Sequence, residues 1–250
     1  MKQLLVRGDD LGYSEAVTLG MISAYEKGIV NSMALMVNMP YTLEAVLLAK
    51  KHKGLCLGLH VNITNGKALA PNDKIPSLID ENGIFISSRV RRQQITQELP
   101  LFSSEEAYIE AEYQLKRYID IVGELPEYID FHVLDVPELI DAVVRLSKDY
   151  HIYCLYAQDI EPIIHEQSMK QYDYYQNHDN HFENMFIDGD FCMQEGLNVL
   201  VTHPGFIDYD LYTTSSMINE RLKDFSLVTS PIFKNWLQEQ GIEVISFREL

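Results

Sequence analysis

Short apolar runs alternate with longer segments of helical spacing along the whole chain, and this alternation constrains the fold more than any other feature. The runs are rich in Val, Ile and Leu, which favour strands, whereas the segments between them space apolar residues along one helical face. Because strands that alternate with helices form βα units, the sequence predicts an α/β fold around a parallel sheet. The expected strands are residues 4–8, 30–37, 55–61, 128–132, 152–155, 198–202 and 243–247.

The expected helices carry start and stop signals. Residues 15–27 follow Ser14, which is placed as an N-cap, and end before Gly28. The last helix opens at a proline and closes at Gly241. Including that one, further helices are expected at residues 40–52, 104–122, 136–148 and 231–240.

The length of 250 residues suits one α/β barrel or two small domains. No linker or internal repeat divides the chain, so a single domain over residues 1–250 is expected. Two excursions, residues 64–100 and residues 158–191, each follow an expected strand. Loops in that position gather on the active-site face of a parallel barrel, and the first is long enough to be a functional loop or lid.

The second excursion is polar and rich in aromatic residues. Tyr172, Tyr174 and Tyr175 could line a sugar site, or they could serve core or interface packing. His178 and His181 could form a ligand pair, but the absence of a strand pattern around them favours a solvated loop.

Composition excludes several classes of partner. With 20 basic and 37 acidic residues, the formal net charge of −17 would repel nucleic acid and anionic lipid, so neither is expected to bind. No apolar run is long enough to span a membrane, and the run at residues 4–6 is too short for a signal-peptide core, which favours a cytoplasmic protein. Three widely spaced cysteines offer neither a disulfide framework nor a metal knuckle.

Two adjacent carboxylates, Asp9 and Asp10 in VRGDDLGYS, follow the first expected strand. Adjacent carboxylates repel each other, and a nearby cation is the usual remedy when they are buried. Before the turn at Gly12 both could reach the mouth of a barrel. The alternative interpretation of DDLG is a solvated turn, where Asp is common.

Three histidines end expected strands. His60 ends LCLGLHV and His132 ends YIDFH, and each alone could be an ordinary hydrogen-bonded core residue. Together with an aspartate from a third strand end, they describe a 2-His-1-carboxylate site for a divalent ion. His203 in VLVTHPG could act as a general acid or could simply sit in a polar turn. No GxGxxG, P-loop or GxSxG motif is present, which argues against dinucleotide, P-loop phosphate and serine-hydrolase sites.

Several separate motifs match one family. VRGDDLGYSEAVTLGMISAYEKGIVNSMALMVN resembles the opening of the YdjC-like carbohydrate deacetylases, the chitooligosaccharide deacetylase family. GLHVNITNGKAL resembles that family's GLH-x-N-x-T-x-G segment, YIDFH its I-D-x-H segment and MQEGLNVLVTHPGFID its E-G…HPG…D segment. RLKDFSLVTSPIFKNWLQEQGIEVISFREL is similar to its C-terminal arginine, helix and SFREL strand, so the matches run in order over nearly the whole chain.

The resemblance implies a distorted, seven-stranded (β/α) TIM-like barrel and metal-dependent removal of an acetyl group from N-acetylated amino sugars or oligosaccharides. It implies that Asp10, His60 and His132 hold the metal, that Asp9 is the general base and that His203 is the general acid. One carboxylate would ligate a divalent ion, with Mg²⁺ or Zn²⁺ expected, and the other would take the proton of the attacking water. A homodimer is expected for an enzyme of this kind.

Departures from the family pattern leave the substrate open. The family often continues as I-D-x-H-x-H-x-H, whereas Leu134 and Val136 stand at the two later histidine positions here. Residues 152–155 lack the arginine that commonly reaches toward the substrate, and Arg7-Gly8 stands where the family tends to have Asn-Ala. The alternatives are another metal-dependent amide, ester or phosphoester hydrolase on the same barrel, or a catalytically weak sugar-binding regulatory relative.

Overall fold

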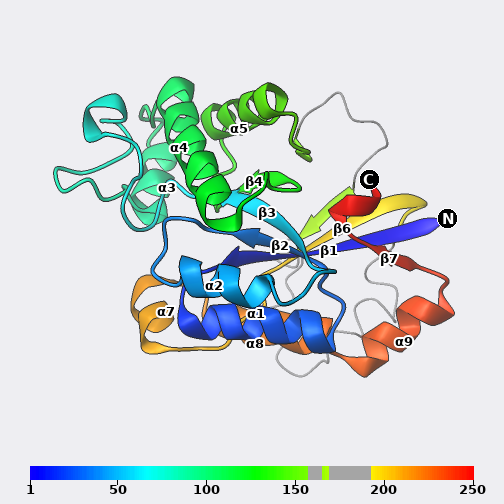
Figure 1. The fold of residues 1–250 in the computed structure, drawn as a ribbon. Coiled ribbons are helices and arrows are strands. Elements are labelled where there is room, and N and C mark those ends of the chain that lie inside the picture. The colour runs from blue at the N-terminus through cyan, green and yellow to red at the C-terminus, as the bar shows by residue number, and fades with distance from the viewer. Residues whose placement is uncertain (157–164, 169–192) are drawn as a thin grey trace.

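A computed structural model describes residues 1–156, 165–168 and 193–250. Its centre is a curled parallel sheet with the strand order β4-β3-β2-β1-β6-β5, and a further strand, β7, pairs with β1 (Figure 1). The described strands are β1 (Lys2–Leu11), β2 (Ser32–Leu35), β3 (Cys56–Val61), β4 (Ile129–Phe131), β5 (His165–Ser168), β6 (Gly196–Thr202) and β7 (Glu243–Ile245).

Helices cover both sides of this sheet. In Figure 1, α4 and α5 lie on one side, and α1, α2 and α8 lie on the other. The described α-helices are α1 (Glu15–Lys27), α2 (Thr42–Ala49), α3 (Ser88–Thr96), α4 (Ser104–Val122), α5 (Pro137–Tyr150), α7 (Tyr209–Thr214), α8 (Asn219–Val228) and α9 (Pro231–Glu239). The α/β class with a parallel sheet is as predicted.

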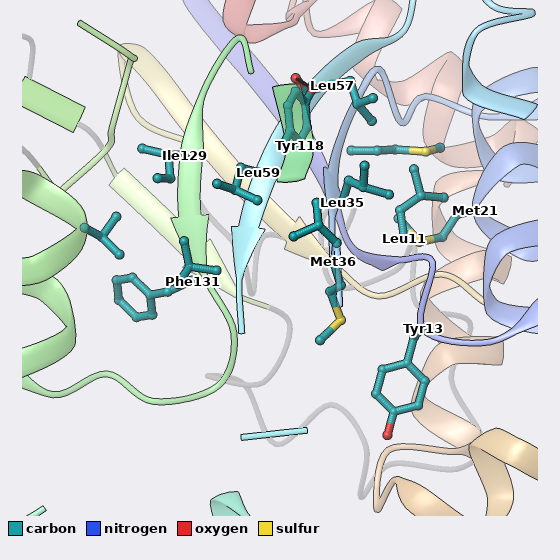
Figure 2. Close-up of a cluster of buried hydrophobic side chains, with 14 of the residues drawn as sticks. Leu11, Tyr13, Met21, Leu35, Met36, Leu57, Leu59, Tyr118, Ile129 and Phe131 are labelled. Carbon is teal, nitrogen blue, oxygen red and sulfur yellow. Dashed lines mark hydrogen bonds between the residues drawn. The ribbon is translucent and has the colours of Figure 1, made fainter. Parts of the chain in front are cut away.

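The central strands β2, β3 and β6 are buried almost throughout, which explains why they are apolar along most of their length. Along β1, Leu4 and Val6 belong to one hydrophobic cluster and Leu5 to a second, smaller cluster. Figure 2 shows part of the larger cluster, where Leu59 of β3 and Met21 of α1 are among the labelled side chains. The sheet is thus a rigid base for the residues that follow its carboxyl ends.

The strand predictions need two corrections. Residues 152–155 do not form a strand, because Tyr153 makes only an isolated bridge to Tyr128. Instead β5 lies at His165–Ser168, inside the excursion 158–191, and pairs with β6. Its sequence, HEQS, is polar and has no alternation, so no strand signal marked it. The expected distorted, seven-stranded (β/α) TIM-like barrel stays a prediction.

Two helix predictions match the observed bounds, and the others differ or are missing. α1 and α4 have the predicted bounds, and Ser14 caps α1 by accepting a hydrogen bond from the Val17 amide. α2, α5 and α9 differ from their predicted bounds by a few residues, whereas α3, α7 and α8 were not predicted. Among the described residues no helix is long and apolar enough to cross a membrane.

Candidate metal centre

The adjacent carboxylates lie at an irregularity near the end of β1. The register of β1 against β2 shifts between Gly8 and Leu11, and Asp10 has a φ of 78°. A left-handed conformation costs a non-glycine residue about 1–2 kcal/mol. Because a bulge re-aims side chains, the two carboxylates do not meet the same partners. Asp10 faces the histidines, and Asp9 faces Arg7.

The structure brings the three predicted metal ligands together. Oδ1 of Asp10 lies 2.8 Å from Nδ1 of His132 and 3.3 Å from Nε2 of His60. The three potential ligand atoms all lie within 4.8 Å of one another. His60 belongs to β3, and His132 directly follows β4, so neighbouring strands supply both imidazoles.

Two of the potential ligand atoms lack a hydrogen-bond partner, and a divalent cation would supply one. Oδ1 of Asp10 and Nε2 of His60 are buried, and neither completes a hydrogen bond with any described residue. A buried polar atom without a partner is costly, and a cation between the oxygen and the two ring nitrogens would satisfy it. Two imidazoles and one carboxylate suit several divalent metals, so the donor set does not select one.

Two further contacts fix the ligands from behind. Nη2 of Arg221 lies 2.6 Å from Oδ2 of Asp10, and Oδ1 of Asp130 lies 2.6 Å from Nδ1 of His60. Oδ2 of Asp10 and Nδ1 of His60 are thus engaged on the side away from the centre. Oδ1 of Asp10 and Nε2 of His60 remain available to bind a metal. A carboxylate behind a metal-binding imidazole fixes the orientation of the ring.

The same contacts shift the pKa values. Burial raises the pKa of Asp10, but the charges of His132 and Arg221 outweigh it and hold that pKa well below the usual value. Burial lowers the pKa of His60, whereas the carboxylates of Asp130 and Asp9 raise it to about 10. The centre thus combines an ionised carboxylate with an imidazole that must lose a proton before it can bind a metal.

Arg7 joins the two carboxylates on the other side of His60. Its Nε lies 2.8 Å from Oδ1 of Asp9 and 3.1 Å from Oδ2 of Asp130, and its Nη2 donates to Oδ2 of Asp9 at 3.0 Å. All three side chains are at most 4% exposed. Sequence reasoning gave no role to Arg7 or Asp130. A period-two signal was available, because each lies two residues before a predicted site residue, Asp9 or His132, on the same strand face.

A pocket opens onto the centre. Asp10 and His132 line it, as does His203, so the predicted general acid shares one cavity with two predicted ligands. Oδ2 of the buried Asp224 accepts a hydrogen bond from the His203 amide at 2.7 Å and lies 3.9 Å from Nδ1 of its ring. Asp9 is buried and does not line the pocket.

The first excursion contributes to this pocket. Asn65, and Ser88 and Arg92 of α3, line part of it, and a functional role for residues 64–100 stays a prediction. Leu134 and Val136, at the positions of the absent histidines, are buried in the larger hydrophobic cluster. The tyrosine cluster and the pair His178 and His181 lie outside the described residues.

Comparisons with known proteins agree on one family. A family model described as YdjC-like protein matches residues 3–239. Carbohydrate deacetylase 2 of Listeria innocua is 28% identical over 99% of this chain and 98% of its own length. The carbohydrate deacetylase of Geobacillus stearothermophilus is 31% identical over 98% of this chain and 96% of its own length.

Solved structures share the fold. A crystal structure of a protein from Enterococcus faecalis V583 matches with a TM-score of 0.83 and 26% identity, covering 99% of this chain and 98% of that one. A family 4 acetyl xylan esterase from Clostridium thermocellum, in complex with a cobalt ion, matches with a TM-score of 0.50 and 10% identity, covering 99% of this chain and 89% of that one. The second likeness concerns the fold alone.

Proposed function

Because this chain belongs to the YdjC-like protein family, we propose that it is a metal-dependent carbohydrate deacetylase that removes acetyl groups from N-acetylated amino sugars or oligosaccharides. The observation that carries the proposal is that Asp10, His60 and His132 lie together beside a pocket. The curated relatives that this chain matches over nearly their full length are named carbohydrate deacetylases. The substrate is a small N-acetylated sugar, and neither nucleic acid nor membrane takes part.

Asp10, His60 and His132 would hold one divalent ion, with Zn²⁺ or Mg²⁺ proposed. When bound, such an ion supplies Lewis-acid activation of the acetamide carbonyl and of the attacking water. The buried contacts of Arg221 with Asp10 and of Asp130 with His60 support this assignment. They leave Oδ1 of Asp10 and Nε2 of His60 free to bind the same ion.

Two further residues would move protons. Asp9 acts as the general base for the attacking water: its carboxylate lies behind the pocket surface, within 4.8 Å of a ring nitrogen of His60, and Arg7 holds it there. His203 acts as the general acid and delivers a proton to the nitrogen of the departing sugar amine. The position of His203 in the pocket, with the carboxylate of Asp224 near its Nδ1, supports this role.

The finer assignments complete the proposal. The chain forms a single domain over residues 1–250, with the sheet belonging to the distorted seven-stranded barrel type, and works in the cytoplasm as a homodimer. The two described cysteines, Cys56 and Cys154, are both buried.

A substrate panel tests the reaction. The metal-loaded protein should release acetate from N-acetylated sugars and leave a generic phosphoester intact. Phosphoester turnover without acetate release would favour another metal hydrolase, and sugar binding without turnover would favour a binding protein.

The role of Asp9 has its own test. Asp9→Asn should retain the metal while kcat falls by roughly 10²-fold or more, the usual scale of general acid–base catalysis. Metal content measured beside acetate release separates loss of the base from loss of the ion. A variant that deacetylates at the parent rate would contradict the role.

A further inference from the structure

The side chain of Asn65 contacts a proposed metal ligand from the side away from the ion. Its Nδ2 lies 3.0 Å from Nε2 of His132, whereas Nδ1 of the same ring lies 2.8 Å from Oδ1 of Asp10. Each ring nitrogen therefore has a polar neighbour within 3.0 Å. Among the described residues, Asn65 supplies the side-chain contact to Nε2.

The backbone of Asn65 has hydrogen bonds of its own, in addition to the 3.4 Å contact from its side-chain Nδ2 to Oγ1 of Thr64. Its carbonyl oxygen accepts hydrogen bonds from Nδ2 of Asn62 at 2.7 Å and from Nδ2 of Asn38 at 3.0 Å, and its amide donates to Oδ1 of Asn62 at 3.1 Å. Asn62 is in turn tied to α4, because its carbonyl accepts a hydrogen bond from Nε2 of Gln114 at 2.6 Å. A change confined to the Asn65 side chain therefore leaves these loop contacts in place.

The chemistry of imidazole gives this contact a consequence. A neutral imidazole carries one N–H and one lone pair, so a ring that ligates through Nδ1 must carry its hydrogen on Nε2. A carboxamide can present either its oxygen or its nitrogen to Nε2, because rotation about its terminal bond exchanges the two edges. An asparagine can thus accept the hydrogen bond that Nε2–H donates in the metal-binding tautomer.

We propose that Asn65 is a positioning residue that accepts a hydrogen bond from Nε2–H of His132 and so directs the Nδ1 lone pair at the ion shared with Asp10 and His60. The inference rests on the proposed metal site and extends it to a residue that lines the pocket and contacts His132 rather than the ion. Asp130 contacts the ring nitrogen of His60 that faces away from the ion, and Asn65 does the same for His132 with an uncharged side chain.

The test compares Asn65→Leu, which keeps the size and removes the hydrogen-bonding edge, with Asn82→Leu, the same exchange at an exposed position of the same excursion. Zn²⁺ affinity is measured by competition with a chromophoric chelator. Imidazole nitrogen and N–H signals of His132 are followed by NMR in Zn²⁺-loaded protein labelled with ¹⁵N-histidine. Thermal unfolding without metal reports the fold of each variant.

Asn65→Leu should bind Zn²⁺ roughly 10–100-fold more weakly, the usual cost of losing the partner behind a ligating histidine. The Nε2–H signal of His132, protected from solvent exchange in the parent, should be lost, while Asn82→Leu should match the parent in both measurements. Parent-like affinity in Asn65→Leu overturns the inference, as does weaker binding with an unchanged Nε2–H signal.

These outcomes are separable from those of the proposed reaction. A parent protein that binds Zn²⁺ through His132 but releases no acetate from any sugar refutes the deacetylase and leaves the role of Asn65 standing. A parent protein whose His132 signals do not respond to Zn²⁺ refutes the metal site, and the inference falls with it.

Discussion

Replacement of Arg7 by methionine is the most direct test of the electrostatic arrangement beneath the centre. Arg7 is 3% exposed, and its guanidinium contacts two carboxylates, Asp9 and Asp130, that are themselves almost fully buried. Arg7→Met keeps an unbranched apolar side chain but leaves both carboxylates without this cation. Breaking a buried ion pair by removing one partner costs about 3–5 kcal/mol, because the remaining charge stays buried.

The loss is measured as the free energy of unfolding from urea titrations. Arg7→Met should lose about 3–5 kcal/mol, whereas Arg117→Met, at an exposed position of α4, should stay within about 0.5 kcal/mol of the parent. The double variant Arg7→Met/Asp9→Asn should recover part of the loss, since one of the two negative charges is removed as well.

A loss below about 1 kcal/mol in Arg7→Met, the range of an exposed pair, would refute the argument. The same holds if Asp9→Asn fails to rescue Arg7→Met. Either result would mean that the two carboxylates are solvated or protonated in the folded protein.

Two other perturbations test the centre and its frame. Because His60 has a pKa of about 10 without metal, metal binding below that pH releases a proton from the ring. The apparent Zn²⁺ affinity, measured by chelator competition, should therefore rise about tenfold per pH unit between pH 6 and 8. An affinity that does not change with pH would contradict this. In the metal-free protein, the stability that the raised pKa provides is complete below the unfolded value of about 6.5 and is lost as the pH rises through about 10. Gly20→Ala would place a Cβ 2.6 Å from the backbone of Gly205 and Phe206, in the turn that follows His203. This variant should lose about 1–3 kcal/mol in the free energy of unfolding and release acetate more slowly. Gly→Ala inside a helix is usually stabilising, and a more stable variant would show that the turn moves aside without cost.

The sequence by itself determined the features that depend on local signals. Apolar periodicity and caps gave α1 and α4 with their bounds, and the position of His60 and His132 at strand ends was enough to expect them on one edge of a parallel sheet. Parallel strands bring their carboxyl ends together whatever the details of packing. Fold class was therefore enough to expect two histidines and an aspartate at one site, whereas the choice of Asp10 rather than Asp9 as the ligand came from the family resemblance.

Tertiary structure alone decided the contacts that join distant segments or break local rules. Arg221 reaches Asp10 across 211 positions of the chain, and no periodicity relates the two. The strand at His165–Ser168 has a polar sequence and is defined by pairing with β6. Asp10 adopts a left-handed backbone that is uncommon outside glycine, and its carboxylate contacts His132 while that of Asp9 contacts Arg7. Such features depend on the surrounding packing, because only a completed fold can offset the strain and the buried charge.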